Sequence, residues 1–459
     1  MSYARPTPFF KNVFKNYLKR EKMKKLYYFL IGMEIILGGL FLYFAYSWIN
    51  TPESQILEPK TVFTGALAGL NTLILKYFPK KWEDKKACPF DEKILYKNQD
   101  TILYSIFEEL ERELFEKFNI NFKNKLLIEK NGENEILLPA IMLTQNEVKI
   151  SNTLSKTVDT NPINEDFIEI LKKQCGQRIW QNPTYRLMNI DTDINELSIG
   201  ESTYYQTLST CDIHYYNFMD KNNHMINGEG EEYNNWLTKL RNIIVNNQFS
   251  TVSASLGCST LLMLKNPKNK IYEYYIIDNS KIKNAKSTKH VIPAFMFQPT
   301  KKIQNNEDFR LQSDLTTQIL REFGEEFLGI EELEEVNDYE KLQAEMDKNK
   351  VLKKLKKLLE NKKAIIKILG VSLDVYRLRP EILTTLIIDD ENFFKHFNQE
   401  RKLSWEALET NSDGLMIVTV DDEQTYLDLI FNKERPLVSP GAACLKLGRE
   451  YMLNKYLKR

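Results

Sequence analysis

The stretch VSASLGCSTLLMLKN, residues 252–266, and the KIYEYYIID that follows it, residues 270–278, decide the fold that this sequence predicts. Both are rich in apolar, aromatic and β-branched residues, and the turn-forming residues Asn266, Pro267 and Asn269 separate them. This pattern is typical of two antiparallel strands joined by a short connection.

Strand and helix candidates alternate on both sides of this predicted hairpin. Further strands are expected at residues 126–129, 135–143 and 203–208, and in LTTLIID (383–389) and DGLMIVTVD (413–421). Apolar residues at helical spacing predict helices at 102–118 and 311–330, a highly charged helical stretch at 331–369, and a final helix after Pro440. The mixture predicts an α+β sandwich.

The composition is that of a protein whose larger part folds in water. Charged residues make up 27% of the chain, with 63 Lys and Arg balancing 63 Asp and Glu, and the mean hydropathy is −0.42. Pro79 and Pro89 interrupt a polar segment, so we expect a linker at 79–99 and one domain at 100–459. Charge neutrality argues against DNA or RNA as a partner.

The cysteine pattern favours a reducing environment. The five cysteines are an odd number and show no CxxC spacing, so neither a zinc site nor a disulfide framework is expected.

Residues 26–49, LYYFLIGMEIILGGLFLYFAYSWI, form an apolar run that is long enough to cross a bilayer, which takes about 20 residues. A weaker run, TVFTGALAGLNTLIL, follows at 61–75. Together they predict a two-helix transmembrane region at 26–78 after a basic segment at 1–25. Basic residues flank both outer ends, so both termini of this multi-pass protein are expected in the cytoplasm.

Small and acidic residues within these runs suggest further roles. Gly65 and Gly69 form a GxxxG face, and Gly38 and Gly39 are the expected opposing surface. The face would serve either oligomerisation or packing within the hairpin. Glu34 is costly facing lipid, so it is expected to face protein or water.

Residues 321–330, REFGEEFLGI, resemble the core of the Nudix box. Helical spacing places Glu322, Glu325 and Glu326 together, as a Mg²⁺ site requires. The box is incomplete, because Glu307 stands at its expected first glycine and Ser313, beside Asp314, at its early glutamate. The resemblance implies a Nudix-like α/β/α sandwich with helical additions, supported by the segment HVIPAFMFQP (290–299) and the Thr203–Tyr204 pair.

A membrane region joined to a Nudix-like domain is similar to one class of effector in CBASS, the bacterial anti-phage systems in which a cyclase makes a cyclic nucleotide. The resemblance implies an inner-membrane effector whose cytosolic domain binds that cyclic nucleotide. Binding would drive homo-oligomerisation and disruption of the bilayer, leading to abortive infection. No cofactor would be required, although Mg²⁺ is possible.

Several residues are candidates for the ligand site, because arginine binds phosphate and aromatic rings stack on bases. They are Tyr185, Arg186, His290, Phe297, Arg321, Arg377 and Arg379. The other histidines, His214, His224 and His396, show no metal-ligand spacing.

Two alternatives stay open. The chain could be a membrane-tethered Nudix hydrolase of nucleoside diphosphate derivatives that uses Glu322, Glu325 and Glu326. It could also be an interaction protein that docks a partner at the membrane.

Overall fold

The computed structural model divides the chain into two units, Met1–Lys86 and Ala87–Arg459. It describes residues 88–90, 127–131, 134–138, 140–143, 148–152, 159–177, 179–191, 195–220, 225, 228–246, 248–278, 289–299, 305–330, 339–401, 414–431 and 437–457, all in the second unit.

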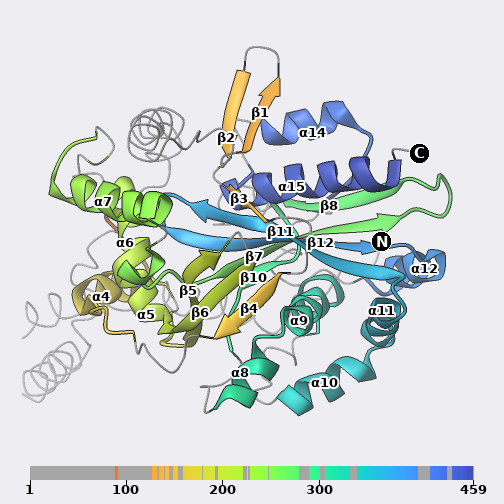
Figure 1. Ribbon diagram of the computed structural model, residues 1–459, viewed down its shortest axis with the longest axis horizontal. Coiled ribbons are helices and arrows are strands. Elements are labelled where there is room, and N and C mark those ends of the chain that lie inside the picture. Colours follow the sequence, from red (N-terminus) through yellow and green to blue (C-terminus); the bar gives the residue numbers. More distant parts are fainter. Residues whose placement is uncertain are drawn as a thin grey trace, which may run out of the picture. The chain divides into compact units, whose positions relative to one another are not determined.

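A mixed sheet forms the centre of the described unit (Figure 1). Its strand order is β13-β8-β7-β12-β11-β3, with β10 paired to β7 and β9 to β8. The bounds are β3 Ala140–Met142, β7 Gly257–Lys265, β8 Tyr272–Asp278, β9 Lys289–Val291, β10 Ala294–Met296, β11 Ala364–Asp374, β12 Arg379–Ile388 and β13 Leu415–Thr419.

The hairpin predicted at 252–278 is confirmed as β7 and β8. The two strands pair antiparallel, with Met263 opposite Tyr274, and Lys270 turns the chain with a φ of 64°. On its other side β7 pairs parallel with β12, with Cys258 opposite Ile382. All residues of β7 except its two ends are buried, as expected of a central strand.

Helices cover both faces of this sheet (Figure 1). On one face lie α9 (Leu315–Leu328), α11 (Lys350–Glu360) and α12 (Glu391–Glu400), preceded by α8 (Asn306–Gln312) and α10 (Tyr339–Lys348). On the other lie α14 (Glu423–Ile430) and α15 (Ser439–Met452). Alternate residues of β7 supply the two cores: Leu262 packs toward Phe323 and Phe397, and Leu261 toward Ala443 and Leu445.

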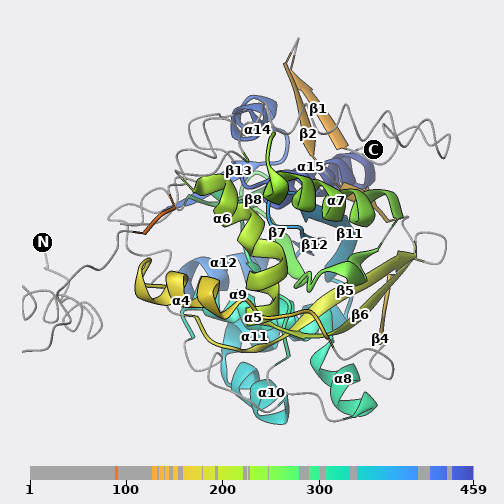
Figure 2. The ribbon, with the colours of Figure 1, turned by 90° about the vertical axis from the view of Figure 1, so that its left-hand side faces the viewer.

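A second sheet has the order β4-β6-β5 and lies beside helices α4 and α5 (Figure 2). Its strands are β4 Lys149–Asn152, β5 Pro183–Asp191 and β6 Glu196–Thr203. The nearby helical elements are α4 Glu165–Lys173, α5 Tyr204–Thr207, η2 Leu208–Asp212, α6 Ile213–Met219, α7 Glu231–Asn246 and η4 Phe249–Thr251. The remaining elements are the hairpin of β1 (Leu127–Asn131) and β2 (Asn134–Leu138), and η7 (Leu453–Leu457) after α15.

Two local predictions were wrong. The strand expected at 203–208 ends at Thr203, whose side chain caps α5 in a capping box with Gln206. The helix expected through residue 369 ends at Glu360, because Lys362 adopts a φ of 55° and the apolar run from Ala364 pairs with β12 instead.

The segment Cys88–Phe90 is fastened to the helices around α4. Cys88 and Cys175 form a disulfide with a Cα–Cα distance of 4.7 Å, and the Phe90 ring lies 4.9 Å from that of Tyr216 and 6.3 Å from that of Phe167. The expectation that no disulfide forms was wrong, since the fold joins two cysteines that are 87 residues apart.

The predicted fold class needs a correction in its membrane part. Among the described residues no helix combines the length and apolarity that crossing a bilayer requires; α7, α9 and α15 have 16, 14 and 14 residues. The part of the chain that the structure describes is an α+β fold with mixed sheets, and the predicted transmembrane hairpin is not seen in it. Residues 26–78, with Glu34, Gly38, Gly39, Gly65 and Gly69, and the helix expected at 102–118 lie outside the described residues.

Candidate functional site

Residues 321–330, the segment that resembles the Nudix box, lie in the second half of helix α9 and in the turn that ends it. Asp314 caps its start by accepting hydrogen bonds from the backbone of Thr316 and Thr317, and Gly329 ends it with a φ of 62°. The 311–330 helix prediction is therefore correct in type, although a break at Ser313 separates α8 from α9.

Within α9, Arg321 holds two of the three box glutamates in ion pairs. Its Nη2 lies 2.7 Å from Glu322 Oε1 and its Nε lies 3.6 Å from Glu325 Oε1, and all three side chains are at most 12% exposed. In the ranges that the structure describes, no three His, Cys, Asp or Glu side chains are grouped so as to hold a metal ion. Arg321 thus partners the box carboxylates and lines none of the cavities described below.

Two of the predicted ligand residues, His290 and Arg379, line one cavity of about 200 Å³ where β7 and β12 begin, which we call the β7–β12 pocket. The parallel pairing of the two strands brings their amino-terminal ends together, and β9 and β10 add the rest of the wall. The lining residues are Ser255, Gly257, His290, Ala294, Phe295, Met296, Arg379 and Glu381.

Two arginines stack over aromatic rings: Arg379, which lines this pocket, and Arg377, two residues before it. Arg379 makes a bidentate ion pair with Asp212 through Nε (2.6 Å) and Nη2, and its guanidinium lies 5.6 Å from the Tyr204 ring centroid. Arg377 lies 4.1 Å over the ring of Tyr215. Both arginines also have carboxylate partners, because Arg377 Nε is 3.7 Å from Asp374.

Glu381 supplies the carboxylate of the pocket. Its Oε2 accepts a hydrogen bond from the Ser259 hydroxyl, and Gly257 makes room for it, since a Cβ there would lie 2.7 Å from Glu381 Cγ. Burial raises the pKa of Glu381 to about 7, partly offset by the Ser259 hydrogen bond. Glu381 therefore changes charge near neutral pH.

His290 is a neutral residue of the same pocket lining. Burial lowers its pKa to about 4, and its Nδ1–H donates to the Val291 carbonyl at 3.0 Å. Because Nδ1 carries the proton, Nε2 has an available lone pair. Gly441 of α15 leaves space for the ring, since a Cβ there would lie 3.2 Å from His290 Nδ1.

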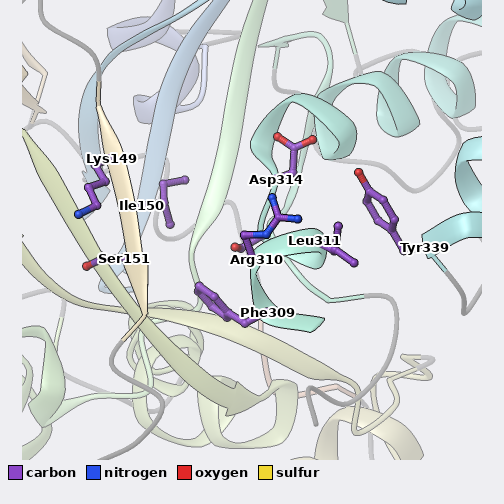
Figure 3. A pocket seen from close by; sticks show the side chains of 9 residues that line it. Lys149, Ile150, Ser151, Phe309, Arg310, Leu311, Asp314 and Tyr339 are labelled. Atoms are coloured by element: carbon purple, nitrogen blue, oxygen red, sulfur yellow. The ribbon is translucent and has the colours of Figure 1, made fainter. Parts of the chain in front are cut away.

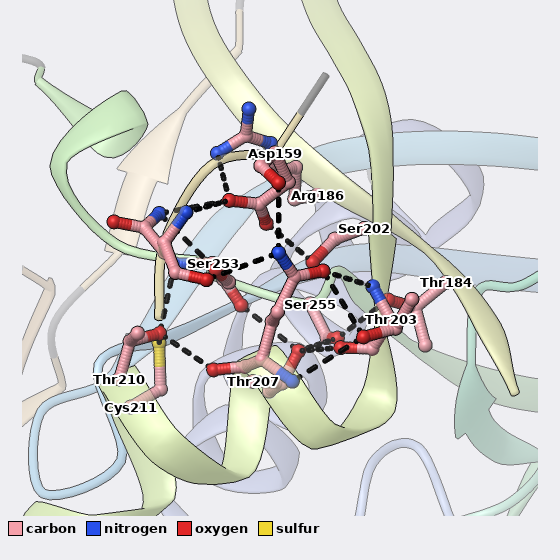
Figure 4. Close-up of polar contacts among 12 residues, drawn as sticks. Asp159, Thr184, Arg186, Ser202, Thr203, Thr207, Thr210, Cys211, Ser253 and Ser255 are labelled. Carbon is pink, nitrogen blue, oxygen red and sulfur yellow. Dashed lines mark hydrogen bonds and ion pairs between the residues drawn. The ribbon is translucent and has the colours of Figure 1, made fainter. Parts of the chain in front are cut away.

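A buried polar network adjoins the pocket at Ser255 (Figure 4). The Ser255 hydroxyl donates to Thr184 Oγ1 at 3.1 Å and contacts the Thr207 hydroxyl. Further along, Arg186 Nη1 lies 3.2 Å from Asp159 Oδ1, and Asp159 Oδ2 accepts from Ser202 at 2.6 Å. Both members of the ion pair are at most 4% exposed, so this network holds β5 and β6 against the segment that leads into β7.

Tyr185 and Phe297 are core residues next to this network. Their rings are 5.0 Å apart, both are fully buried, and the Tyr185 N–H donates to the Phe297 carbonyl. Arg186, Tyr185 and Phe297 therefore support the region around the pocket and do not line it.

A second cavity of about 520 Å³ lies between β4 and α8, and we call it the α8–β4 cleft (Figure 3). Lys149 and Ser151 of β4 lie across from Arg310, Asp314 and Tyr339. Asp314 and Ser313 both line this cleft, and Ser313 stands where the Nudix box would carry its early glutamate. Lys149 and Arg310 are at least 70% exposed, and Arg310 forms a bidentate pair with Glu307.

The remaining histidines lie apart from the pocket lining. His214 is buried near Lys239, and burial lowers its pKa to about 3. His396 is on α12, and its Nδ1–H donates to the Asn392 carbonyl. His224 lies outside the described residues.

Sequence reasoning missed Glu381, Ser255 and Asp212. Glu381 carried a signal, because a lone carboxylate between Pro380 and the apolar run ILTTLII marks the start of a buried strand. Asp212 carried no such signal in the sequence, because only the fold brings it to Arg379, which is 167 residues away. Comparison of the chain with protein-family profiles and with curated proteins gave no match.

Proposed function

We propose that this chain is a sensor effector of the CBASS type, whose Ala87–Arg459 unit binds a cyclic nucleotide in the β7–β12 pocket. The observation that carries the proposal is the joint lining of one cavity by His290 and Arg379, with Phe295 and Glu381 in the same wall. Polar groups converging on a partly apolar cavity are typical of a ligand site.

Binding without hydrolysis is supported by the surroundings of the box glutamates. Glu322 and Glu325 are committed to Arg321, and Ser313 stands where the box would carry its early glutamate. The competing hydrolase proposal needs those carboxylates to hold Mg²⁺.

The proposed place of action is the bacterial inner membrane, where ligand-bound protomers assemble and disrupt the bilayer. The membrane location and the disruption of the bilayer rest on the resemblance of the sequence to CBASS effectors. A ligand can drive assembly only if it binds the assembled state better than the separate protomers.

Calorimetric titration of the full-length chain with cyclic mono-, di- and trinucleotides tests the binding step. We expect one class of cyclic nucleotide to bind, and His290→Ala to weaken it at least tenfold. His396→Ala, on α12, is the matched control and should bind as the parent does.

Two readouts on the same protein separate the alternatives. Cleavage of a nucleoside diphosphate derivative that depends on Mg²⁺ and is lost in Glu325→Gln would support the hydrolase. Absence of binding across the whole panel would overturn the sensor. Recovery of the protein in the soluble fraction of lysed cells would overturn the proposed membrane location.

A further inference from the structure

The β7–β12 pocket presents hydrogen-bond acceptors to whatever enters it. Glu381 contributes a carboxyl group, which is ionised above its pKa of about 7 and of which one oxygen accepts from Ser259. His290 lines the same pocket, and its unprotonated Nε2 is the ring nitrogen that can accept a hydrogen bond. The cation in the wall, Arg379, is already neutralised by its bidentate pair with Asp212. A group that fits this wall has to bring N–H donors.

The same charges disfavour a phosphate in the pocket. A phosphate would lie beside the Glu381 carboxylate, and like charges at close range repel each other. An uncharged base with an amino group meets no such repulsion and offers donors to both acceptors.

The size of the pocket also favours a single base. At about 200 Å³ it is smaller than the roughly 300–1,000 Å³ of a site that encloses a whole drug-sized ligand. It therefore suits one planar ring system, with the rest of the ligand outside. Phe295 in the lining supplies an aromatic surface for such a ring.

We propose that the pocket reads a guanine base of the ligand, with Glu381 accepting hydrogen bonds from the ring N–H and the neighbouring amino group, and His290 as a further acceptor. The inference rests on the proposed function and deepens it by naming the base. Among the common bases, guanine places two N–H donors side by side, which a carboxylate accepts with two oxygens at once. Adenine offers one amino group there, and uracil one N–H between two carbonyls.

The sharpest test leaves the protein unchanged. At pH 8, above the pKa of about 7 of Glu381, the full-length chain is titrated with cyclic di- and trinucleotides that carry guanosine, inosine, adenosine or uridine. Inosine lacks only the amino group, so we expect it to bind about ten- to a hundredfold more weakly than guanosine, as for the loss of one hydrogen bond to a charged acceptor. Equal binding of the guanosine and inosine ligands overturns the inference and leaves the sensor proposal standing. Absence of any binding overturns both.

A substitution assigns the effect to Glu381. Glu381→Gln removes one acceptor and adds an amide donor, so the preference for guanosine over inosine should shrink to less than threefold. Arg310→Gln, in the α8–β4 cleft, is the control and should keep the parent preference. A folded Glu381→Gln protein that keeps the full preference would contradict the assignment.

Discussion

Glu381 couples the folding of the domain to pH through a buried carboxyl group. Its pKa is raised from 4.5 to about 7, so the folded state holds this proton more tightly than the unfolded state. Its stabilising contribution is complete below about pH 4.5 and is lost as the pH rises through about 7. The side chain in the Glu381→Gln variant cannot ionise, so this variant does not lose stability in this way as the pH rises.

We therefore expect the free energy of unfolding of the parent, relative to Glu381→Gln, to fall between pH 4.5 and pH 7.5. Urea denaturation of both proteins at several pH values measures this difference. His290 and His214, with pKa values lowered to about 4 and about 3, act in the opposite sense, but they are present in both proteins and cancel. A difference that stays constant with pH would contradict the prediction.

The ion pair of Asp159 and Arg186 predicts a large single-residue effect. Asp159→Ala leaves the buried Arg186 charge uncompensated and removes the acceptor of the Ser202 hydroxyl. Breaking such a pair costs about 3–5 kcal/mol. Asp347→Ala, which breaks the exposed pair with Lys356, is the control and should cost less than about 1 kcal/mol. Equal losses in urea denaturation would show that burial of the first pair contributes little.

Some of the residues that were predicted to bind ligand lie together in the candidate site, and others do not. His290 and Arg379 were expected to bind ligand and share a cavity, whereas Arg321 was expected to bind ligand and instead pairs with Glu322 and Glu325. An arginine's chemistry can be read from sequence, but its partner depends on which carboxylates the fold brings within reach.

Helix α15 packs so closely on the sheet that one added methyl group at Gly448 would clash with β7. A Cβ at Gly448 would lie 2.7 Å from Leu261 Cδ2 of β7. Gly448→Ala should therefore destabilise the protein by about 1–3 kcal/mol, despite alanine's higher helix propensity.

Shortening Leu261 tests whether its contact with the added methyl group causes the loss of stability. In the Leu261→Ala background the added methyl group has space, so Gly448→Ala should cost much less, and the two substitutions should show a coupling energy above about 0.5 kcal/mol. Additive effects in denaturant titrations would mean that the clash is absorbed elsewhere.

Elements with a strong local pattern were predictable, and their partners were not. β7, β8, β12, β13 and α15 were each expected near their observed positions because their apolar runs are bounded by turn residues. The parallel pairing of β7 with β12 was not predicted, because nothing local specifies a contact between distant strands. The run from Ala364 was misassigned as helix, since short apolar runs fit either structure until pairing decides.

For the whole molecule, the disulfide between Cys88 and Cys175 sets how stability responds to reductant. In the chain-entropy view, closing a loop with a sequence separation of 87 stabilises the fold by up to about 4–5 kcal/mol. We expect dithiothreitol to lower the urea midpoint of the parent, and Cys175→Ser to lower it similarly. Dithiothreitol should then have no further effect on Cys175→Ser; a further drop in that variant would show that another reducible link is responsible.

The pairing of β7 with β12 also has a consequence for synthesis on the ribosome. The hydroxyls of Thr260 and Thr384, which hydrogen-bond across these strands at 2.7 Å, are 124 residues apart. A ribosome that adds about 5–20 residues per second needs roughly 6–25 s to make that interval. During this time the apolar strand β7 has been made and its parallel neighbour has not. We therefore expect the nascent chain to depend on ribosome-associated chaperones, and its yield to depend on the translation speed between these two strands.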